Sequence, residues 1–258
     1  MSTDAKTVKS YDDQAMVWAK RMRSGENIAH KYLEKPAMYQ LLGDIRGKSV
    51  LCVGCGTGEE CEYLKSQGAK RVVGIDISSG LIEVAKESFT GIEFEVMDME
   101  QLSYMPDSFD VVYSSLTMHY VQDWIRVFKE ILKVMKADGR FIFSTHHPIK
   151  WASEVTRDEK KSSFIMGFER DKNEMEVVVH GDYLNERKIS DKWFGSMEVT
   201  FYSKPISQIF REVTESGFRI VNFLEPKAID EAKEKAKGFW TIHQKIPMFM
   251  MFELMKAK

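Results

Sequence analysis

The chain has 258 residues, of which 43% are hydrophobic and 29% are charged, and Lys plus Arg number 37 against 39 for Asp plus Glu. This composition is that of one large globular domain, and the near-neutral charge argues against a nucleic-acid binder, which needs a basic face to meet phosphates. No uncharged run reaches the ~20 residues of a membrane span, and the start of the chain lacks the apolar stretch of a signal peptide. The three cysteines, an odd number within residues 52–61, do not form a disulfide framework. We therefore expect a cytoplasmic protein without a membrane or nucleic-acid partner.

The first half of the chain predicts alternating helices and strands. Residues 12–42 have helical spacing, and Pro36 is placed to open a helix that runs to Leu42. Apolar, β-branched runs then predict strands at 49–54, 71–76, 92–97, 109–114 and 140–145. Between them, helical patterns cover 58–67, 79–88 and 122–136. This alternation is typical of βαβ units, and right-handed crossovers make the sheet parallel and doubly wound.

The alternation ends after Pro148, where an irregular polar segment begins. Further strands are expected at 175–184, 196–205, 218–224 and 246–255, and helices at 206–216 and 228–238. The Met-rich last strand is expected to be packed core, because thioethers fill irregular interiors well. We divide the chain into an N-terminal helical lid (1–45), a cofactor-binding core (46–148), a β-rich cap insertion over the substrate site (149–204) and a C-terminal completion of the core sheet (205–258).

Three glycines two residues apart, Gly54, Gly56 and Gly58, follow the first strand in the stretch "VLCVGCGTGEE". Glycine permits positive φ and lets a ligand approach the backbone, and the helix that follows adds a weak positive field. The next strand ends in Asp76, 22 positions after Gly54 (76 minus 54). At that spacing a carboxylate accepts hydrogen bonds from both hydroxyls of a ribose.

The next two strands also end in groups suited to a nucleoside. Asp98 and Met99 follow the strand at 92–97, an acid for an exocyclic amine and a thioether for the face of an adenine. Ser114 ends the strand at 109–114. A dinucleotide is disfavoured, because a G-x-G-x-x-G fingerprint counted from Gly54 requires glycine where Glu59 stands.

Four motifs together resemble the class I S-adenosylmethionine-dependent methyltransferases, and most of all the small-molecule branch that includes the ubiquinone and menaquinone enzymes. They are "VLCVGCGTG", "VVGIDIS", "FEVMDMEQLSYMPDSFDVVYSSLTMHYVQD" and "ILKVMKADGRFIFS", and the tail "YSKPISQIFREVTESGFRIVNFLEP" is also similar to this branch. The resemblance implies a Rossmann-like, mostly parallel seven-stranded sheet with an antiparallel last strand. It also implies S-adenosylmethionine as cofactor and S-adenosylhomocysteine as product.

The family's cofactor-binding roles carry over to matching positions of this sequence. The resemblance implies that the glycine turn holds the methionine part, that the second strand's acid binds ribose, that the acid after the third strand meets adenine, and that the end of the fourth strand lies near the methionine amino group. The residues so implied are Gly54, Gly56, Asp76, Asp98 and Ser114, with Cys55, Ile77 and Met99 as neighbours. One departure matters: Cys52 stands where the family usually has an acid that helps to hold the methionine end.

Candidates for the chemistry are the histidines that follow the fourth and fifth strands, His119, His146 and His147. A general base is needed only for an acceptor that carries a proton. Adjacent histidines in extended chain point apart, so at most one of His146 and His147 is expected to reach the substrate. The alternative role for His119 is helix capping or packing, and for His146 and His147 it is a turn before Pro148 in which a histidine bonds to the backbone. No metal site is expected.

The expected substrate pocket is aromatic and combines the lid, the fourth strand's end and the cap. Its predicted residues are Tyr11, Trp18, Tyr120, Trp151 and Trp193. They indicate a small, partly apolar substrate. Together with this, the resemblance implies transfer of a methyl group to O, N or C of that molecule by in-line displacement. The alternatives are an RNA or protein methyltransferase, a cofactor-binding protein with other chemistry, and a cofactor-binding pseudo-enzyme. The protein is expected to be a monomer or a homodimer.

Overall fold

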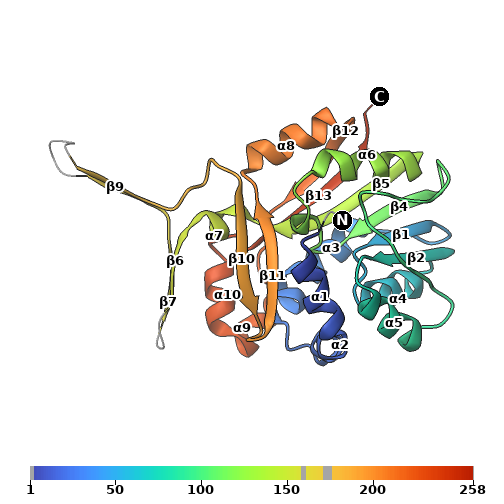
Figure 1. Ribbon diagram of the computed structural model, residues 1–258, viewed down its shortest axis with the longest axis horizontal. Coiled ribbons are helices and arrows are strands. Elements are labelled where there is room, and N and C mark those ends of the chain that lie inside the picture. The colour runs from blue at the N-terminus through green and yellow to red at the C-terminus, as the bar shows by residue number, and fades with distance from the viewer. Residues whose placement is uncertain (1–2, 158–160, 171–175, 258) are drawn as a thin grey trace.

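A seven-stranded sheet in the order β12-β13-β5-β4-β1-β2-β3 forms the centre of the protein (Figure 1). The structure, a computed structural model, describes residues 3–157, 161–170 and 176–257. Strands β3, β2, β1, β4 and β5 are parallel to one another, and β13 lies antiparallel between β5 and β12. The strands are β1 (Ser49–Val53), β2 (Arg71–Asp76), β3 (Glu93–Val96), β4 (Phe109–Ser114), β5 (Met135–His146), β12 (Phe218–Leu224) and β13 (Phe249–Lys256). The predicted doubly wound sheet with an antiparallel last strand is confirmed.

Helices cover both faces of the sheet (Figure 1). Side chains of α6 (Trp124–Val134) and α8 (Ile206–Glu215) pack on one face, and those of α3 (Lys35–Leu42), α4 (Glu59–Ser66) and α5 (Ser79–Ser88) pack on the other. The strands that they cover are runs of Val, Ile, Leu and Phe because both strand faces are buried. The Met-rich strand β13 is core, with Met250 and Met251 at most 1% exposed. Strand order reverses beside β1, so β1 and β4 diverge into a crevice at their carboxyl ends.

Residues 3–42 contain four helices, and the first of them begins earlier than predicted. They are α1 (Ala5–Asp13), α2 (Ala15–Ser24), the π-helix η1 (His30–Glu34) and α3. Asp4 caps α1 by accepting hydrogen bonds from the N–H groups of Lys6 and Thr7. Pro36 stands in the first turn of α3, as predicted, where the lack of an N–H group has no cost.

Two predicted helix boundaries are wrong. Residues 135 and 136, predicted as the end of the helix at 122–136, instead begin β5, and the β4–β5 pair has a register shift between Phe109 and Val111. The helix expected at 228–238 is two short helices, α9 (Glu231–Lys235) and α10 (Lys237–His243), with extended φ at Ala236 between them. Ala232, Phe239 and Trp240 all pack against the same core cluster, so tertiary packing overrides the local propensity for one helix.

The segment after β5 is rich in strands that stay outside the main sheet. It contains α7 (Pro148–Ala152), β6 (Glu154–Arg157), β7 (Ser162–Ile165), β8 (Gly167–Arg170), β9 (Val177–His180), β10 (Arg187–Trp193) and β11 (Met197–Ser203). β6, β7 and β9 project from the body of the molecule (Figure 1). The predicted strand at 175–184 appears as β9, and residue 175 lies outside the described residues. β10 was not predicted, because Ile189 and Trp193 are its apolar residues and a half-exposed edge gives a weak signal.

The β10–β11 hairpin is fastened to the N-terminal helices. The Thr200 N–H donates to Thr7 Oγ1 at 2.8 Å, and Ser196 Oγ donates to Gln14 Oε1 at 2.7 Å. None of the helices in the described ranges has the length and apolar character that crossing a bilayer requires. The hairpin and α1 together lie over the carboxyl ends of the central strands.

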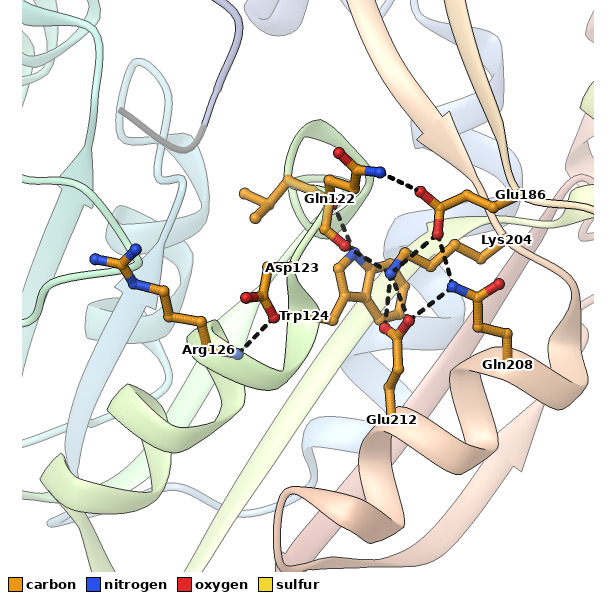
Figure 2. A network of polar contacts seen from close by, with 9 residues as sticks. Gln122, Asp123, Trp124, Arg126, Glu186, Lys204, Gln208 and Glu212 are labelled. Carbon is orange, nitrogen blue, oxygen red and sulfur yellow. Dashed lines mark hydrogen bonds and ion pairs between the residues drawn. The ribbon is translucent and has the colours of Figure 1, made fainter.

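A buried polar cluster around Lys204 joins this hairpin to the core (Figure 2). Lys204 is 3% exposed, and its Nζ donates to both Glu212 carboxylate oxygens at 2.7 Å and to the Gln122 carbonyl at 2.6 Å. Gln208 Nε2 donates to Glu186 Oε2 and to Glu212 Oε1, and Gln122 Nε2 donates to Glu186 Oε1. The loop after β4, both ends of the hairpin and α8 are therefore held by one lysine.

Candidate functional site

A cavity of about 460 Å³ lies at the carboxyl ends of the central strands. Each of five strands contributes to its wall: the lining includes Gly54 and Gly56 after β1, Asp76 and Ile77 after β2, Met97 and Met99 after β3, Ser115 to Thr117 after β4, and His146 at the end of β5. α1 and α2 supply Thr7, Val8, Tyr11 and Trp18, and the β10–β11 hairpin supplies Asp191, Lys192, Trp193 and Phe194. The sheet edge, the N-terminal helices and the hairpin thus surround one space.

The glycine turn after β1 is held open toward this cavity. Gly54, Gly56 and Gly58 have φ values of +68°, +55° and +92°, a region that side chains disfavour. The N–H groups of Gly54 and Cys55 both donate to the Ile75 carbonyl, at 2.8 and 2.9 Å. A Cβ atom on Gly54 would collide with the side chain of Thr117. The turn therefore needs glycine for both conformation and space.

Asp76 is fixed beside the turn by the backbone. Its Oδ2 accepts the Gly56 N–H at 2.9 Å, and its Oδ1 accepts the Ser78 N–H at 3.0 Å. Burial raises the pKa of the Asp76 carboxyl, and the backbone hydrogen bonds partly oppose that rise. The Ser78 hydroxyl in turn donates to Asp12 of α1 at 2.6 Å. Asp76 therefore presents its carboxylate in one orientation, tied to both the glycine turn and the N-terminal helix.

Three of the predicted cofactor residues lie outside the cavity lining. Cys55 is 3% exposed and its thiol faces the Gly56 carbonyl, with burial raising its pKa to about 11. Ser114 is fully buried inside the sheet, and the structure places Ser115 at the wall instead, because successive side chains of a strand alternate in direction. Asp98 accepts the Glu100 N–H in the turn after β3, between the lining residues Met97 and Met99. Gly54, Gly56, Asp76, Ile77 and Met99 do line the cavity.

Two of the three candidate histidines meet in the cavity. The rings of His119 and His146 stack at 3.9 Å between centroids with 17° between planes. His119 Nε2 and His146 Nδ1 are buried and have no hydrogen-bond partner within the described ranges. His147 points away: its Nδ1 accepts the Ile149 N–H at the start of α7, and its Nε2 lies 2.7 Å from Glu225 Oε1. The side chains of His146 and His147 thus point apart, as adjacent residues in extended chain do, and His147 lies outside the cavity lining.

Burial keeps both cavity histidines neutral. It lowers the pKa of His119 to about 3, and it lowers the pKa of His146 well below the usual value, with the nearby His119 adding to that shift. Two buried imidazoles stacked at this distance cannot both hold a proton, because each positive charge disfavours the other. At neutral pH the pair offers nitrogen lone pairs and N–H donors without charge.

The cavity histidines should make the protein less stable in acid. The unfolded chain binds a proton at His119 below pH 6.5 and the folded chain does not, so the free energy of unfolding falls as pH falls through that value. We expect the free energy of unfolding, measured by urea denaturation, to fall between pH 7.5 and pH 5.5. In the His119→Asn variant this fall should be about 1.4 kcal/mol smaller than in the unmodified protein.

A control for this experiment is His180→Asn on the exposed β9 strand. There the hydrogen bond to Glu154 raises the pKa of the histidine, so its loss cannot make the fall with acid shallower. Equal slopes for the His119→Asn variant and the unmodified protein would show that His119 protonates in the folded state.

All five predicted pocket aromatics line the cavity: Tyr11, Trp18, Tyr120, Trp151 and Trp193. The Tyr11 and Tyr120 hydroxyls lie 2.6 Å apart, which joins α1 to the loop after β4, and burial raises the pKa of each phenol. Trp18 packs edge-on to Tyr11, and Trp151 and Trp193 flank His146 at 5.5 and 5.9 Å between centroids.

Several lining residues were not predicted from the sequence. Ser115, Lys150 and Lys192 are among them. Ser115 is found by moving one residue past the end of the predicted strand. The two lysines give no such signal, because they belong to α7 and β10 and resemble surface charges in the sequence.

Comparison with known proteins identifies the relatives of this chain. The pattern of the methyltransferase domain family matches residues 51–143. The crystal structure of an S-adenosylmethionine-dependent methyltransferase from Mesorhizobium loti has 28% identity and a TM-score of 0.69, over 85% of this chain and 95% of that one. An uncharacterized protein of Haemophilus influenzae is 29% identical over 220 residues, 82% of this chain and 83% of its own length. A ubiquinone biosynthesis O-methyltransferase of Neisseria meningitidis is 37% identical over 108 residues, 40% of this chain and 45% of that enzyme.

Proposed function

The chain belongs to the class I S-adenosylmethionine-dependent methyltransferases, and on that premise we propose that it methylates a small, partly apolar molecule held in the aromatic half of the cavity. Its similarity to the ubiquinone biosynthesis O-methyltransferase extends over 40% of this chain. The acceptor is therefore argued from the site itself.

The residues at the sheet edge fit the cofactor. Gly54 and Gly56 leave a bare backbone beside the cavity, and we assign this turn to the methionine part of the cofactor. Asp76, with its orientation fixed by two backbone N–H groups, is assigned to the ribose hydroxyls. Ile77, Met97 and Met99 are assigned to the adenine, with Asp98 beside them. When bound, S-adenosylmethionine supplies a methyl group on a positively charged sulfur.

One observation carries the proposal for the acceptor. Three buried polar atoms in the histidine half of the cavity, His119 Nε2, His146 Nδ1 and Trp151 Nε1, have no hydrogen-bond partner in the part of the chain that the structure describes. A buried polar group without a partner is costly, so these atoms favour a ligand with its own hydrogen-bonding groups. The tryptophan and tyrosine rings around them favour a flat or apolar body.

The main role that we assign to these residues is to align the acceptor, rather than to hold its proton. Methyl transfer needs the acceptor atom in line with the methyl group and water kept away. Because burial makes His119 and His146 weak bases, we assign them to orienting the acceptor by hydrogen bonds and to passing its proton on, not to holding it. α1, α2 and the β10–β11 hairpin cover the cavity, which favours a small acceptor over RNA or protein, since a macromolecule needs an open surface.

The proposal is tested with S-adenosylmethionine carrying a deuterated methyl group and with fractionated cell extract. We expect mass spectrometry to find the label in a compound of the small-molecule fraction, with one S-adenosylhomocysteine formed per labelled product. The Asp76→Asn variant serves as the inactive control. Label in the RNA or protein fraction alone would overturn the proposed acceptor class, and product without S-adenosylhomocysteine would overturn the proposed reaction.

A further inference from the structure

A fully buried acid lies directly behind the cavity wall. Glu34, the last residue of the π-helix η1, has 0% exposure. Its Oε1 accepts hydrogen bonds from Ser115 Oγ at 2.8 Å and from Ser144 Oγ at 2.6 Å. Its Oε2 is buried and has no hydrogen-bond partner among residues 3–157, 161–170 and 176–257. Because Ser115 itself lines the cavity, one hydroxyl group separates this carboxyl from the ligand space.

The hydrogen bonds of Glu34 continue to the glycine turn. Ser144 Oγ accepts the Leu116 N–H at 2.9 Å, which holds Leu116 at a φ of +48°. The Thr117 hydroxyl lies 3.0 Å from the Ser115 carbonyl oxygen and 3.3 Å from the Gly54 carbonyl oxygen. A strained backbone position that persists is held by its surroundings, and here Glu34 and Ser144 hold it. Glu34 thereby fixes the segment from Ser115 to Thr117 against Gly54.

Charge complementarity indicates which part of the cofactor lies near Glu34. With the ribose at Asp76 and the adenine at the end of β3, the amino acid end of the cofactor extends toward β4, where Ser115 lies. That end carries an ammonium group, which an acid stabilises. Of the cavity-lining residues that the structure describes, Asp76 and Asp191 are acids; Asp76 is assigned to the ribose, and Asp191 lies on β10.

Two neighbouring groups bear on whether Glu34 can supply the negative charge near Ser115. Cys52, two residues before Gly54 on β1, offers a thiol that is 1% exposed where a carboxylate would complete the site. Cys52 packs in the same core cluster as Tyr113, and burial together with the charge of Glu34 raises the pKa of the Tyr113 hydroxyl. Lys35, the next residue after Glu34, pairs with Glu60 at 3.0 Å. The second carboxyl oxygen of Glu34, which has no hydrogen-bond partner in the described ranges, stays buried behind Ser115.

We propose that Glu34 is a positioning residue for the amino acid end of S-adenosylmethionine, acting through Ser115 and supplying the negative charge that Cys52 does not. Glu34 orients the Ser115 hydroxyl, and the negative charge of Glu34 lies behind that hydroxyl. A π-helical turn at a functional site is a recurrent arrangement, and here it brings the acid into the sheet face. The inference rests on the proposed placement of the cofactor.

The test compares two ligands that differ only in the amino acid end. S-adenosylhomocysteine has it, and 5′-methylthioadenosine lacks it. By isothermal titration calorimetry, Glu34→Gln should weaken S-adenosylhomocysteine about tenfold, as expected for one charge-assisted hydrogen bond, and change the affinity for 5′-methylthioadenosine by less than about twofold. Ser115→Ala, which keeps Glu34 but breaks the link, should show the same selectivity. Glu60→Gln, which removes a neighbouring acid of the same core, should not.

The possible results either support the role of Glu34 or overturn it. Equal weakening of both ligands by Glu34→Gln, or no weakening of S-adenosylhomocysteine, would overturn the role of Glu34. If Glu34→Gln does not fold, as judged by thermal denaturation without ligand, Ser115→Ala decides in the same way. Failure of the unmodified protein to bind S-adenosylhomocysteine would instead refute the cofactor placement, so the two failures are distinguishable.

Discussion

Replacing Lys204 by alanine is expected to lower the free energy of unfolding by about 3–5 kcal/mol. The variant leaves the carboxylate of Glu212, which is 8% exposed, without the cation that both its oxygens contact. It also leaves the Gln122 carbonyl without its lysine donor. Removing one partner of a buried pair costs much more than the pair itself contributes, because the remaining charge is desolvated and unpaired. Urea denaturation monitored by circular dichroism measures the change.

Two further variants test that explanation. Lys256→Ala removes a lysine 3.6 Å from an exposed Asp107 oxygen, and it should cost less than about 1 kcal/mol, as surface pairs do. Lys204→Met with Glu212→Leu removes both charges together and should recover part of the stability lost in Lys204→Ala. A loss below about 1 kcal/mol in Lys204→Ala would mean that water or another cation replaces the lysine.

The second large effect is expected at Asp76. Asp76→Asn should weaken the binding of S-adenosylhomocysteine about hundredfold, because two charge-assisted hydrogen bonds to the ribose hydroxyls are lost or reduced. An asparagine has one acceptor oxygen, so it cannot accept the N–H groups of Gly56 and Ser78 on two oxygens and still serve the ribose.

Asp44→Asn is the matched control for this prediction. Asp44 is an exposed aspartate paired with Arg46 before the start of β1, at the opposite end of that strand from Gly54 and outside the cavity lining, and its loss should leave the affinity unchanged within about twofold. Calorimetric titration of both variants provides the comparison. A dissociation constant for Asp76→Asn within about threefold of the unmodified protein would place the ribose elsewhere.

The strand ends were the most predictable part of the site. Parallel strands share one carboxyl edge, so Gly54, Asp76 and Met99 had to lie near one another once the alternation of strands and helices was recognised. The aromatic residues of the lid and cap were predictable for a related reason: Trp18, Trp151 and Trp193 are large apolar side chains in otherwise polar segments, and they need a shared interior.

What the sequence did not predict depends on contacts between distant segments. Glu34 looks like one more helix-surface acid in the sequence, and its burial follows from the meeting of η1 with Ser115 and Ser144, 81 and 110 positions away. Lys204 likewise looks like an exposed lysine of a turn in the sequence. It is buried because Glu212 and Gln122 surround it. The position of Ser115 rather than Ser114 at the wall depends on where β4 leaves the sheet, a boundary that local propensity does not define.

The bond between Asp12 and Ser78 has a consequence for turnover. The segment 76–80 includes the acid assigned to the ribose, and Asp12 Oδ1 accepts the Gly80 N–H at 2.9 Å as well as the Ser78 hydroxyl. Tyr11, the preceding residue, touches Tyr120 over the acceptor half. We therefore expect nucleoside binding and docking of α1 to be thermodynamically linked, because a ligand that orders 76–80 also favours the helix that is hydrogen-bonded to this segment.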